Sequence, residues 1–289
     1  MIPRFNATAF SGLTTEMHKA FTTNGVLVLD ELVSHQDCDR LRLHMNTMMQ
    51  SFDASEHSTV FSTKSEAHAQ DDYFLSSGHQ TRFFFEEEAF DNNGQLTRPL
   101  PEAINKVGHA MHDTDDIFAG FARQPAFKTI ATELGLVDPR LAQSMYIFKQ
   151  PEIGGEVGCH QDATFIRTEP NSCLGFWVAL EDATEENGCL WGIPGGHLGD
   201  QPKSLFIREG TQTRTEVLDD TPYEEDKCVP LLAPKGTVLV FGGLLPHMSR
   251  ANRSSKSRHA YTLHVIDGAA HYPENNWLQR PASMPFGRF

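Results

Sequence analysis

The apolar positions of the first 50 residues follow two different spacings. The segments "LTTEMHKAFTTNG" (13–25) and "SHQDCDRLRLHMNTMMQSF" (34–52) have helical spacing, and the short run "VLVLDEL" between them is mostly apolar. These patterns predict a helix, a strand and a second helix. Ser34, three residues before Asp37, predicts the N-cap of the second helix, and we expect Leu41, Leu43 and Met45 to continue its apolar face.

The next 85 residues are less regular. Residues 51–80 are polar, rich in Ser and His, and without a sustained period, so they predict a long surface loop; loops of this length usually act as lids or are mobile. The aromatic residues of "DYFL" and "RFFFEEEAF" are expected mainly in the core. Residues 101–135 return to helical spacing, with Pro101 near the start and Gly135 as a C-cap.

The character of the chain changes after Pro139. Short β-rich runs such as "QSMYIFKQP", "HQDATFI", "CLGFWVALEDA", "GTVLVFGGLL" and "HAYTLHVID" follow one another, separated by Gly, Pro and Asn. Helices followed by many short strands predict an α+β fold, a double-stranded β-helix or jelly roll with flanking helices. We expect one domain over 1–289, with a helical part up to about residue 138 and a jelly-roll core over about 139–270.

Charge and composition narrow the classes of partner. The formal net charge of −14, without a Lys/Arg run, argues against nucleic-acid binding and favours a small-molecule partner. The chain shows neither a membrane-spanning apolar stretch nor a secretory signal, so we expect a cytoplasmic protein that binds no membrane. The five cysteines are widely spaced and predict buried thiols rather than disulfides or a zinc site.

A candidate metal site lies in "GCHQDATFI". On a strand, His160 and Asp162 would point to the same face, and His247 in "GGLLPHMSR" could supply a third ligand from a distant strand. Two histidines and one carboxylate leave positions open, as in non-haem Fe(II) oxygenases, whereas zinc prefers a more closed site. The H-x-D spacing alone is weak evidence, because a hydrogen-bonded surface histidine would also explain it.

Two further residues, both after His247 in the chain, strengthen the hypothesis of a metal site. Ser249 lies two positions after His247 on the same strand face, and Arg258 lies eleven positions after it on the next β-run. An Arg fork beside a hydroxyl is suited to holding a carboxylate in a bidentate manner. A metal triad followed by a carboxylate clamp is far more specific than the H-x-D spacing.

The chain at this point resembles the Fe(II)/2-oxoglutarate dioxygenases of the phytanoyl-CoA hydroxylase type. The matching stretches are "NGVLVLDELVS", "DYFLSSG", "RFFFEEEAFD", "INKVGHAMH", "QSMYIFKQPEIGGEV", "HQDATF", "WVALEDATEENGCLWGIPGGH", "SRHAYTLHV" and "PENNWLQ". The resemblance covers nearly the whole chain and implies Fe(II), 2-oxoglutarate and O2, with ascorbate as reductant. It implies iron ligation by His160, Asp162 and His247, and cosubstrate contacts from Lys106, Met145, Trp177, Ser249 and Arg258.

Some of these positions have simpler explanations. From the residues alone, Lys106 could be a solvated helix lysine, and Met145 and Trp177 could be core residues. Cys159, directly before the first iron ligand, departs from the family's pattern; alternation on a strand predicts that it faces away from the metal and packs. An aspartate at position 162 is not expected in a halogenase, which needs an open site for chloride.

Substrate contacts are expected from the loop and aromatic region, at Tyr73, Phe74 and Arg82, and from a strand tip near Trp191. Arg82 could bind an acidic group of the substrate, but a surface pair with Glu86 or Glu87 is slightly favoured.

The resemblance predicts oxidation of a C–H bond by hydroxylation, cyclisation or desaturation, and the sequence does not choose among these outcomes. An acyl-CoA substrate is implied only by the family name, and the lack of a basic cluster for the CoA phosphates favours a smaller metabolite. Two other classes stay open: a non-catalytic jelly-roll sensor that binds metal and 2-oxoglutarate, and a cupin-like isomerase using Zn or Mn, against which the Ser249 and Arg258 pair counts. The sequence does not indicate an oligomeric state.

Overall fold

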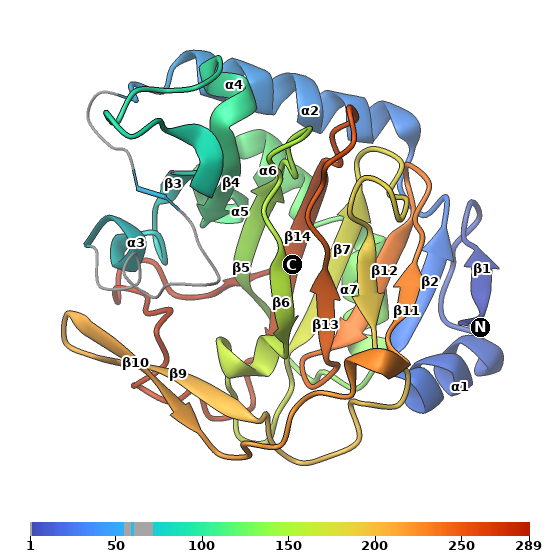
Figure 1. Ribbon diagram of the computed structural model, residues 1–289. Helices are drawn as coiled ribbons and strands as arrows, with labels where there is room; N and C mark the ends of the chain where they lie inside the picture. The colour runs from blue at the N-terminus through green and yellow to red at the C-terminus, as the bar shows by residue number, and fades with distance from the viewer. Residues whose placement is uncertain (1, 55–58, 61–71) are drawn as a thin grey trace.

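Two facing β-sheets form the centre of the molecule in the computed structural model, which describes residues 2–54, 59–60 and 72–289. The larger sheet has nine strands and the smaller has four, and the smaller sheet lies in front of the larger in Figure 1. The larger sheet contains, in spatial order, β1 (Arg4–Asn6), β2 (Val26–Asp30), β12 (Val238–Gly242), β7 (Leu174–Ala179), β14 (Ala260–Asp267), β5 (Pro139–Ile147), β4 (Ile104–His109) and β3 (Thr81–Phe85), with β15 (Gly287–Arg288) also paired to β5. This arrangement is the predicted jelly roll.

The smaller sheet contains the short strands that carry the candidate metal ligands. Its spatial order is β11 (Val229–Leu231), β8 (Leu190–Gly192), β13 (His247–Ser249) and β6 (Val157–His160). A separate hairpin, β9 (Ser204–Glu209) and β10 (Gln212–Val217), lies at one end of the sandwich (Figure 1).

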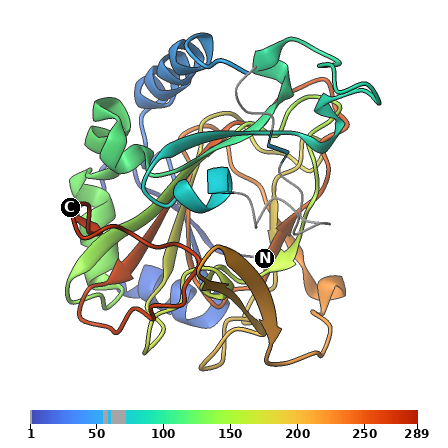
Figure 2. The same cartoon turned by 90° about the vertical axis from the view of Figure 1, so that its left-hand side faces the viewer.

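The longer helices cover the side of the larger sheet that faces away from the smaller one; these blue and green helices lie on the left in Figure 2. The helices are α1 (Thr15–Asn24), α2 (His35–Gln50), α3 (Asp72–Ser76), α4 (Leu100–Ala103), α5 (Met111–Thr114), α6 (Asp116–Ala122) and α7 (Pro125–Glu133), with 3-10 turns η2 (Glu87–Ala89), η3 (Asp162–Thr164) and η4 (Glu225–Lys227). Within the described residues, none of these helices is long and apolar enough to cross a membrane.

Most of the sequence predictions for helix α2 are confirmed. Ser34 is the N-cap, and its side chain accepts a hydrogen bond from the Asp37 backbone N–H. The prediction for Leu43 is wrong, because this side chain is 70% exposed. The buried positions of α2 are Cys38, Leu41, Met45 and Met49, which recur every three or four residues as one helical face requires, whereas Leu43 lies two residues from Leu41 and points away.

The N-terminal half contains more strand than its pattern predicts. The predicted helical stretch 101–135 includes strand β4, and "TRFFF" forms β3 beside it. β4 pairs with β5, about 40 residues later, so tertiary pairing overrides the local helical spacing. Part of the predicted loop 51–80 is also ordered, since Asp72–Ser76 forms α3 with Tyr73 and Phe74 buried; the lid prediction for residues 55–58 and 61–71 lies outside the described residues.

The larger sheet is buried on both faces. Its outer face packs Phe83, Tyr146, Phe176 and Tyr261 against the helices, where they form the main hydrophobic core. Because side chains alternate along a strand, the residues between these positions point toward the smaller sheet. That inner face carries the polar residues considered next.

Candidate metal centre

His160 and His247 meet across the pairing of β6 and β13. They are register partners in the smaller sheet, and their ring centroids are 4.4 Å apart. Side chains of directly paired residues lie on the same face of a sheet, so both rings point to the same side. The candidate ligands from two distant segments are therefore together.

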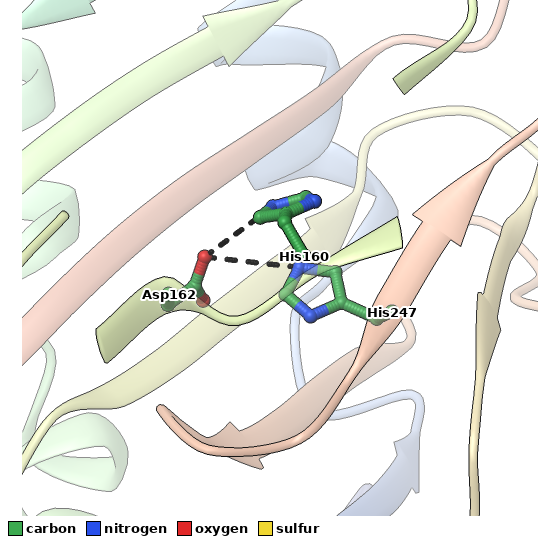
Figure 3. Close-up of side chains that lie close together, drawn as sticks. All are labelled: His160, Asp162 and His247. Atoms are coloured by element: carbon green, nitrogen blue, oxygen red, sulfur yellow. Dashed lines mark ion pairs between the residues drawn. The ribbon is translucent and has the colours of Figure 1, made fainter. Parts of the chain in front are cut away.

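Asp162 reaches the same place by a different route from the one its spacing predicts. Strand β6 ends at His160, and Asp162 is the first residue of η3, whose turn is closed by the backbone N–H groups of Phe165 and Ile166 bonding to the Asp162 carbonyl. The expectation of two ligands on one extended strand face is thus wrong in its geometry. The turn still directs the Asp162 carboxylate toward His160 and His247 (Figure 3).

The three side chains form a compact group of candidate ligand atoms, all within 4.8 Å of one another. Asp162 Oδ1 lies 3.7 Å from His160 Nε2 and 3.7 Å from His247 Nε2. The Asp162 and His247 side chains are 10% and 7% exposed, and the His160 side chain is 26% exposed. One carboxylate oxygen and two imidazole nitrogens thus lie close enough together to bind one metal ion.

Backbone carbonyls fix the tautomers of both histidines. His160 Nδ1 lies 2.8 Å from the Gly158 carbonyl oxygen, and His247 Nδ1 lies 3.0 Å from the Leu245 carbonyl oxygen. A carbonyl can only accept, so each Nδ1 carries a proton and donates, and in the neutral form of each ring Nε2 keeps its lone pair for a metal. Two neutral imidazoles and one carboxylate are a donor set suited to Fe(II).

His264 is a functional candidate that the sequence did not reveal. It lies on β14, it is buried, and its Nε2 is 3.0 Å from Asp162 Oδ2. Nε2–H donates to this oxygen and leaves Oδ1 to face the two histidines. The only sequence signal is a polar residue inside the apolar run "YTLHVID", which a buried strand rarely tolerates without a partner.

The local environment favours an ionised Asp162 beside a neutral His160. Desolvation, reinforced by the nearby His247 ring, lowers the pKa of His160 to about 4. Burial opposes ionisation of Asp162, but His264 and His247 outweigh this effect and hold its pKa well below the usual range. Both protonation states are those required of metal ligands at neutral pH.

The inner face of the larger sheet brings three further predicted residues together. Trp177, Thr262, Met145 and Gly108 follow one another in a single cross-strand row. Lys106 lies two residues before Gly108 on β4 and therefore shares its face. Burial lowers the pKa of the Lys106 ammonium to about 7. Lys106 is thus a buried strand lysine and not the solvated helix lysine that was the alternative.

Arg258 and Ser249 also face this region. Ser249 lies on β13 with His247, as predicted, whereas Arg258 precedes β14 by two residues and is not on the strand itself. The Arg258 side chain is fully buried, its Nε donates to the Gly188 carbonyl oxygen, and its guanidinium lies 5.1 Å from the centroid of the Trp177 ring. The ring and the carbonyl hold the guanidinium in place.

Three buried polar atoms on this side lack a partner within the described part of the chain: Arg258 Nη1, Trp177 Nε1 and Thr262 Oγ1. Buried polar groups are normally hydrogen-bonded, so a cluster of unpaired ones indicates a missing polar ligand. An acidic oxo acid such as 2-oxoglutarate fits, because its carboxylate and keto oxygens accept hydrogen bonds and its charge matches Arg258. Thr262 was not predicted from the sequence.

The expected substrate residues divide into two groups. Tyr73 and Phe74 belong to an aromatic cluster on α3 in which Phe74 stacks on Trp277, at 4.7 Å between centroids, and meets Phe84 edge-on. Phe84 faces the Lys106 ammonium at 5.7 Å from its ring centroid, so this cluster extends to the inner face of the larger sheet.

Arg82 and Trp191 are arranged differently from the predictions. Arg82 stacks over Tyr73 and contacts Ser76, and within the described residues it forms no ion pair with Glu86 or Glu87, so the favoured surface pairing is wrong. Trp191 is the register partner of Met248, one residue from His247 on β13, so its ring lies on the opposite face of the smaller sheet.

Cys159 precedes His160 on β6 and is partly buried. Its side chain packs with Cys228 and Val229 against a hydrophobic cluster that includes Trp191 and Met248. These neighbours agree with the packing role that alternation along the strand predicts.

Known proteins resemble this chain over most of its length. The family model described as phytanoyl-CoA dioxygenase (PhyH) matches residues 21–260. A protein of Arabidopsis thaliana named phytanoyl-CoA dioxygenase is 42% identical over 277 residues, which cover 94% of this chain and 95% of that protein. A Danio rerio protein named phytanoyl-CoA dioxygenase domain-containing protein 1 is 41% identical over 285 residues, covering 95% and 97% of the two chains.

Two solved structures share the fold at lower identity. One is the non-heme alpha ketoglutarate dependent carbocyclase SnoK from nogalamycin biosynthesis, with 18% identity, a TM-score of 0.63, and 91% of this chain and 87% of that chain covered. The other is EctD from S. alaskensis with 2-oxoglutarate and 5-hydroxyectoine, with 19% identity, a TM-score of 0.63, and 98% and 90% covered. These similarities support the jelly-roll fold.

Proposed function

Because this chain belongs to the phytanoyl-CoA dioxygenase family and is an oxygenase that depends on iron and 2-oxoglutarate, we propose that it oxidises an unactivated C–H bond of a small organic substrate. The observation that supports this proposal most is the placement of the His160, Asp162 and His247 triad on the side of the smaller sheet that faces the buried, unpaired Arg258 Nη1. The β-sandwich thus combines a set of metal ligands with an arginine that can bind a carboxylate.

In this proposal His160, Asp162 and His247 hold the iron. The chain orients them in advance, through the carbonyls bound to the two Nδ1 atoms and through His264 bound to Asp162. When bound, iron and 2-oxoglutarate supply the oxidising chemistry with O2, and succinate and CO2 are released. Three protein ligands leave coordination positions open for the cosubstrate and oxygen.

The cosubstrate is held, in our proposal, on the inner face of the larger sheet. Arg258 and Ser249 bind its distal carboxylate, because a buried guanidinium that forms no ion pair with a carboxylate in the described part of the chain favours an anion. Trp177 and Met145 form the apolar wall beside it, and Lys106 supplies a further buried charge. The buried surroundings exclude water, which strengthens each of these charged contacts.

The substrate is proposed to lie against the aromatic cluster that contains Tyr73 and Phe74, with Arg82 at its edge. The cluster also approaches the metal centre, because Phe165 packs on Phe206 and lies 6.0 Å from the His160 ring. An aromatic wall of this kind suits a substrate with a substantial apolar part. It does not distinguish hydroxylation from cyclisation or desaturation.

The test is succinate formation from 2-oxoglutarate by protein purified without air and then supplied with Fe(II), ascorbate and O2. We expect the wild type to form succinate, and Asp162→Ala to form none because the carboxylate ligand is lost. A matched control is Asp220→Ala, a surface aspartate, which should keep wild-type turnover. Tight binding of 2-oxoglutarate by the wild type with no succinate, even across a panel of small organic substrates, would refute the oxygenase proposal and favour a metal-dependent sensor.

A further inference from the structure

A second buried cation lies behind the carboxylate clamp. Lys149 follows strand β5 and is only 2% exposed. Its Nζ donates to Ser249 Oγ at 2.9 Å and to the Gly155 carbonyl oxygen. Ser249 is the hydroxyl that, with Arg258, forms the proposed carboxylate clamp, so Lys149 contacts this site from its protein side.

The hydrogen bond between these two residues has a fixed direction. In its charged form Lys149 has three donors and no acceptor, and an anion bound nearby favours this form, so Ser249 Oγ accepts from Lys149. The hydroxyl proton of Ser249 is then free to be donated to another group. A carboxylate beside Arg258 is an acceptor, and the ammonium therefore prepares Ser249 as a donor to it.

Lys149 is held close to Arg258 by a glycine. A Cβ atom on Gly188 would lie 2.7 Å from Lys149 Cε, and the Gly188 carbonyl accepts the hydrogen bond from Arg258 Nε. Lys149 itself has a φ of 43°, in the left-handed region that is unfavourable for residues with a side chain. The backbone thus accepts strain at the position that brings the two cations together.

Neither cation of this pair is in direct contact with a carboxylate among the described residues. Neither Lys149 nor Arg258 forms an ion pair there. Glu86 and Glu156 act electrostatically on Lys149, and Glu181 and Glu86 act on Arg258, without an ion pair to either cation. Glu86 Oε2 accepts hydrogen bonds from Asn105 and from the Gly155 N–H, and burial raises its pKa. Two buried cations that form no ion pair with a described carboxylate favour the binding of an anion beside them.

We propose that Lys149 is a positioning residue of the cosubstrate site, which holds Ser249 as a donor and adds positive charge, so that the site selects a 2-oxo acid with a second carboxylate. This inference rests on the proposed function. Burial and the nearby Arg258 lower the pKa of Lys149 to about 7, and an anion bound beside it would raise this pKa again. The pocket is therefore prepared electrostatically for a dicarboxylate.

The experiment measures binding directly, by titration calorimetry under nitrogen with Mn(II) in place of iron. The ligands are 2-oxoglutarate and 2-oxobutyrate, which lacks the distal carboxylate. Lys149→Met keeps an apolar chain of similar length and removes the charge, and we expect it to weaken binding of 2-oxoglutarate about tenfold or more and to leave binding of 2-oxobutyrate within about twofold. The matched control is Lys235→Met, which removes a surface lysine paired with Asp39.

A second comparison separates positioning from a general structural effect. In a Ser249→Ala background the hydroxyl is absent, so Lys149→Met should weaken 2-oxoglutarate binding by a clearly smaller factor than in the wild type. Lys149→Gln provides a neutral donor in case the methionine variant does not fold, which thermal unfolding would show.

The outcomes distinguish this inference from the proposed function. If the wild type binds 2-oxoglutarate and both Lys149 variants bind it equally well, the role of Lys149 is refuted and the proposed function stands. Equal losses for 2-oxoglutarate and 2-oxobutyrate would also refute it, because the defect would then not concern the distal carboxylate. If the wild type binds neither acid, the proposed function and this inference both fail.

Discussion

The hydrogen bond from His264 to Asp162 should control how tightly the metal is held. His264 lies on β14, more than 100 residues from Asp162, and donates to the carboxylate oxygen that faces away from His160 and His247. In His264→Leu the donor is lost and a side chain of comparable bulk remains. Asp162 Oδ2 is then a buried charged oxygen without its partner, and the carboxylate is free to rotate.

The size of the effect follows from the burial of the pair. The Asp162 side chain is 10% exposed and that of His264 is 6% exposed, and their separation is 3.0 Å. A buried hydrogen bond to a charged group contributes about 1.5–3 kcal/mol. Loss of such a contact to a metal ligand typically lowers metal affinity about 10- to 100-fold, which agrees with that free energy.

The assay is anaerobic titration of metal-free protein with Mn(II) or Fe(II), followed by calorimetry. His264→Gln keeps an N–H donor of shorter reach and should recover part of the lost affinity, which an effect of packing alone would not explain. If His264→Leu bound the metal as tightly as the wild type, or more tightly, His264 would have no orienting role and Asp162 would be held by the η3 turn alone.

Two further predictions concern stability. Burial lowers the pKa of His259, which contacts Tyr146 and Glu181, below its ordinary value near 6.5. As the pH falls below about 6.5, His259 takes up a proton in the unfolded chain but not in the folded chain. This difference lowers the free energy of unfolding on acidification, by at most about 1.4 kcal/mol per pH unit. Urea unfolding at pH 7 and pH 5 should show a smaller loss in His259→Phe than in the wild type; an equal loss would contradict the assignment. Phe118→Ala should lower the free energy of unfolding by about 3–5 kcal/mol at neutral pH, because Phe118 is fully buried and stacks on Tyr261 at 5.5 Å between centroids, and a loss below about 1 kcal/mol would show that the core collapses around the missing ring.

Local patterns in the sequence predicted the elements that are stabilised locally. Strand β2 and helix α2 with its Ser34 cap appear where apolar spacing and capping chemistry place them. Strands β3 and β4 were not predicted, because their stability comes from pairing with each other and with β5. The same limit bears on Asp162, which was placed on an extended strand, because the turn that contains it is also held from a distant segment, where the Gly243 carbonyl accepts from the Ala163 N–H.

The same distinction between local and long-range information applies to the residues of the candidate site. The sequence allowed the metal ligands His160, Asp162 and His247 to be proposed, because few residue types bind iron. It also allowed Arg258 and Ser249 to be proposed, because few residue types bind a carboxylate. His264 and Lys149 act through single hydrogen bonds to these residues, at sequence separations of 102 and 100. The polar position of His264 in an apolar run indicates a buried partner but not which one, and only the register of β14 and the turn after β5 bring the two residues to their partners. Residues that orient a site are therefore found from their buried partners, and those partners are known only once the sheets have been assembled.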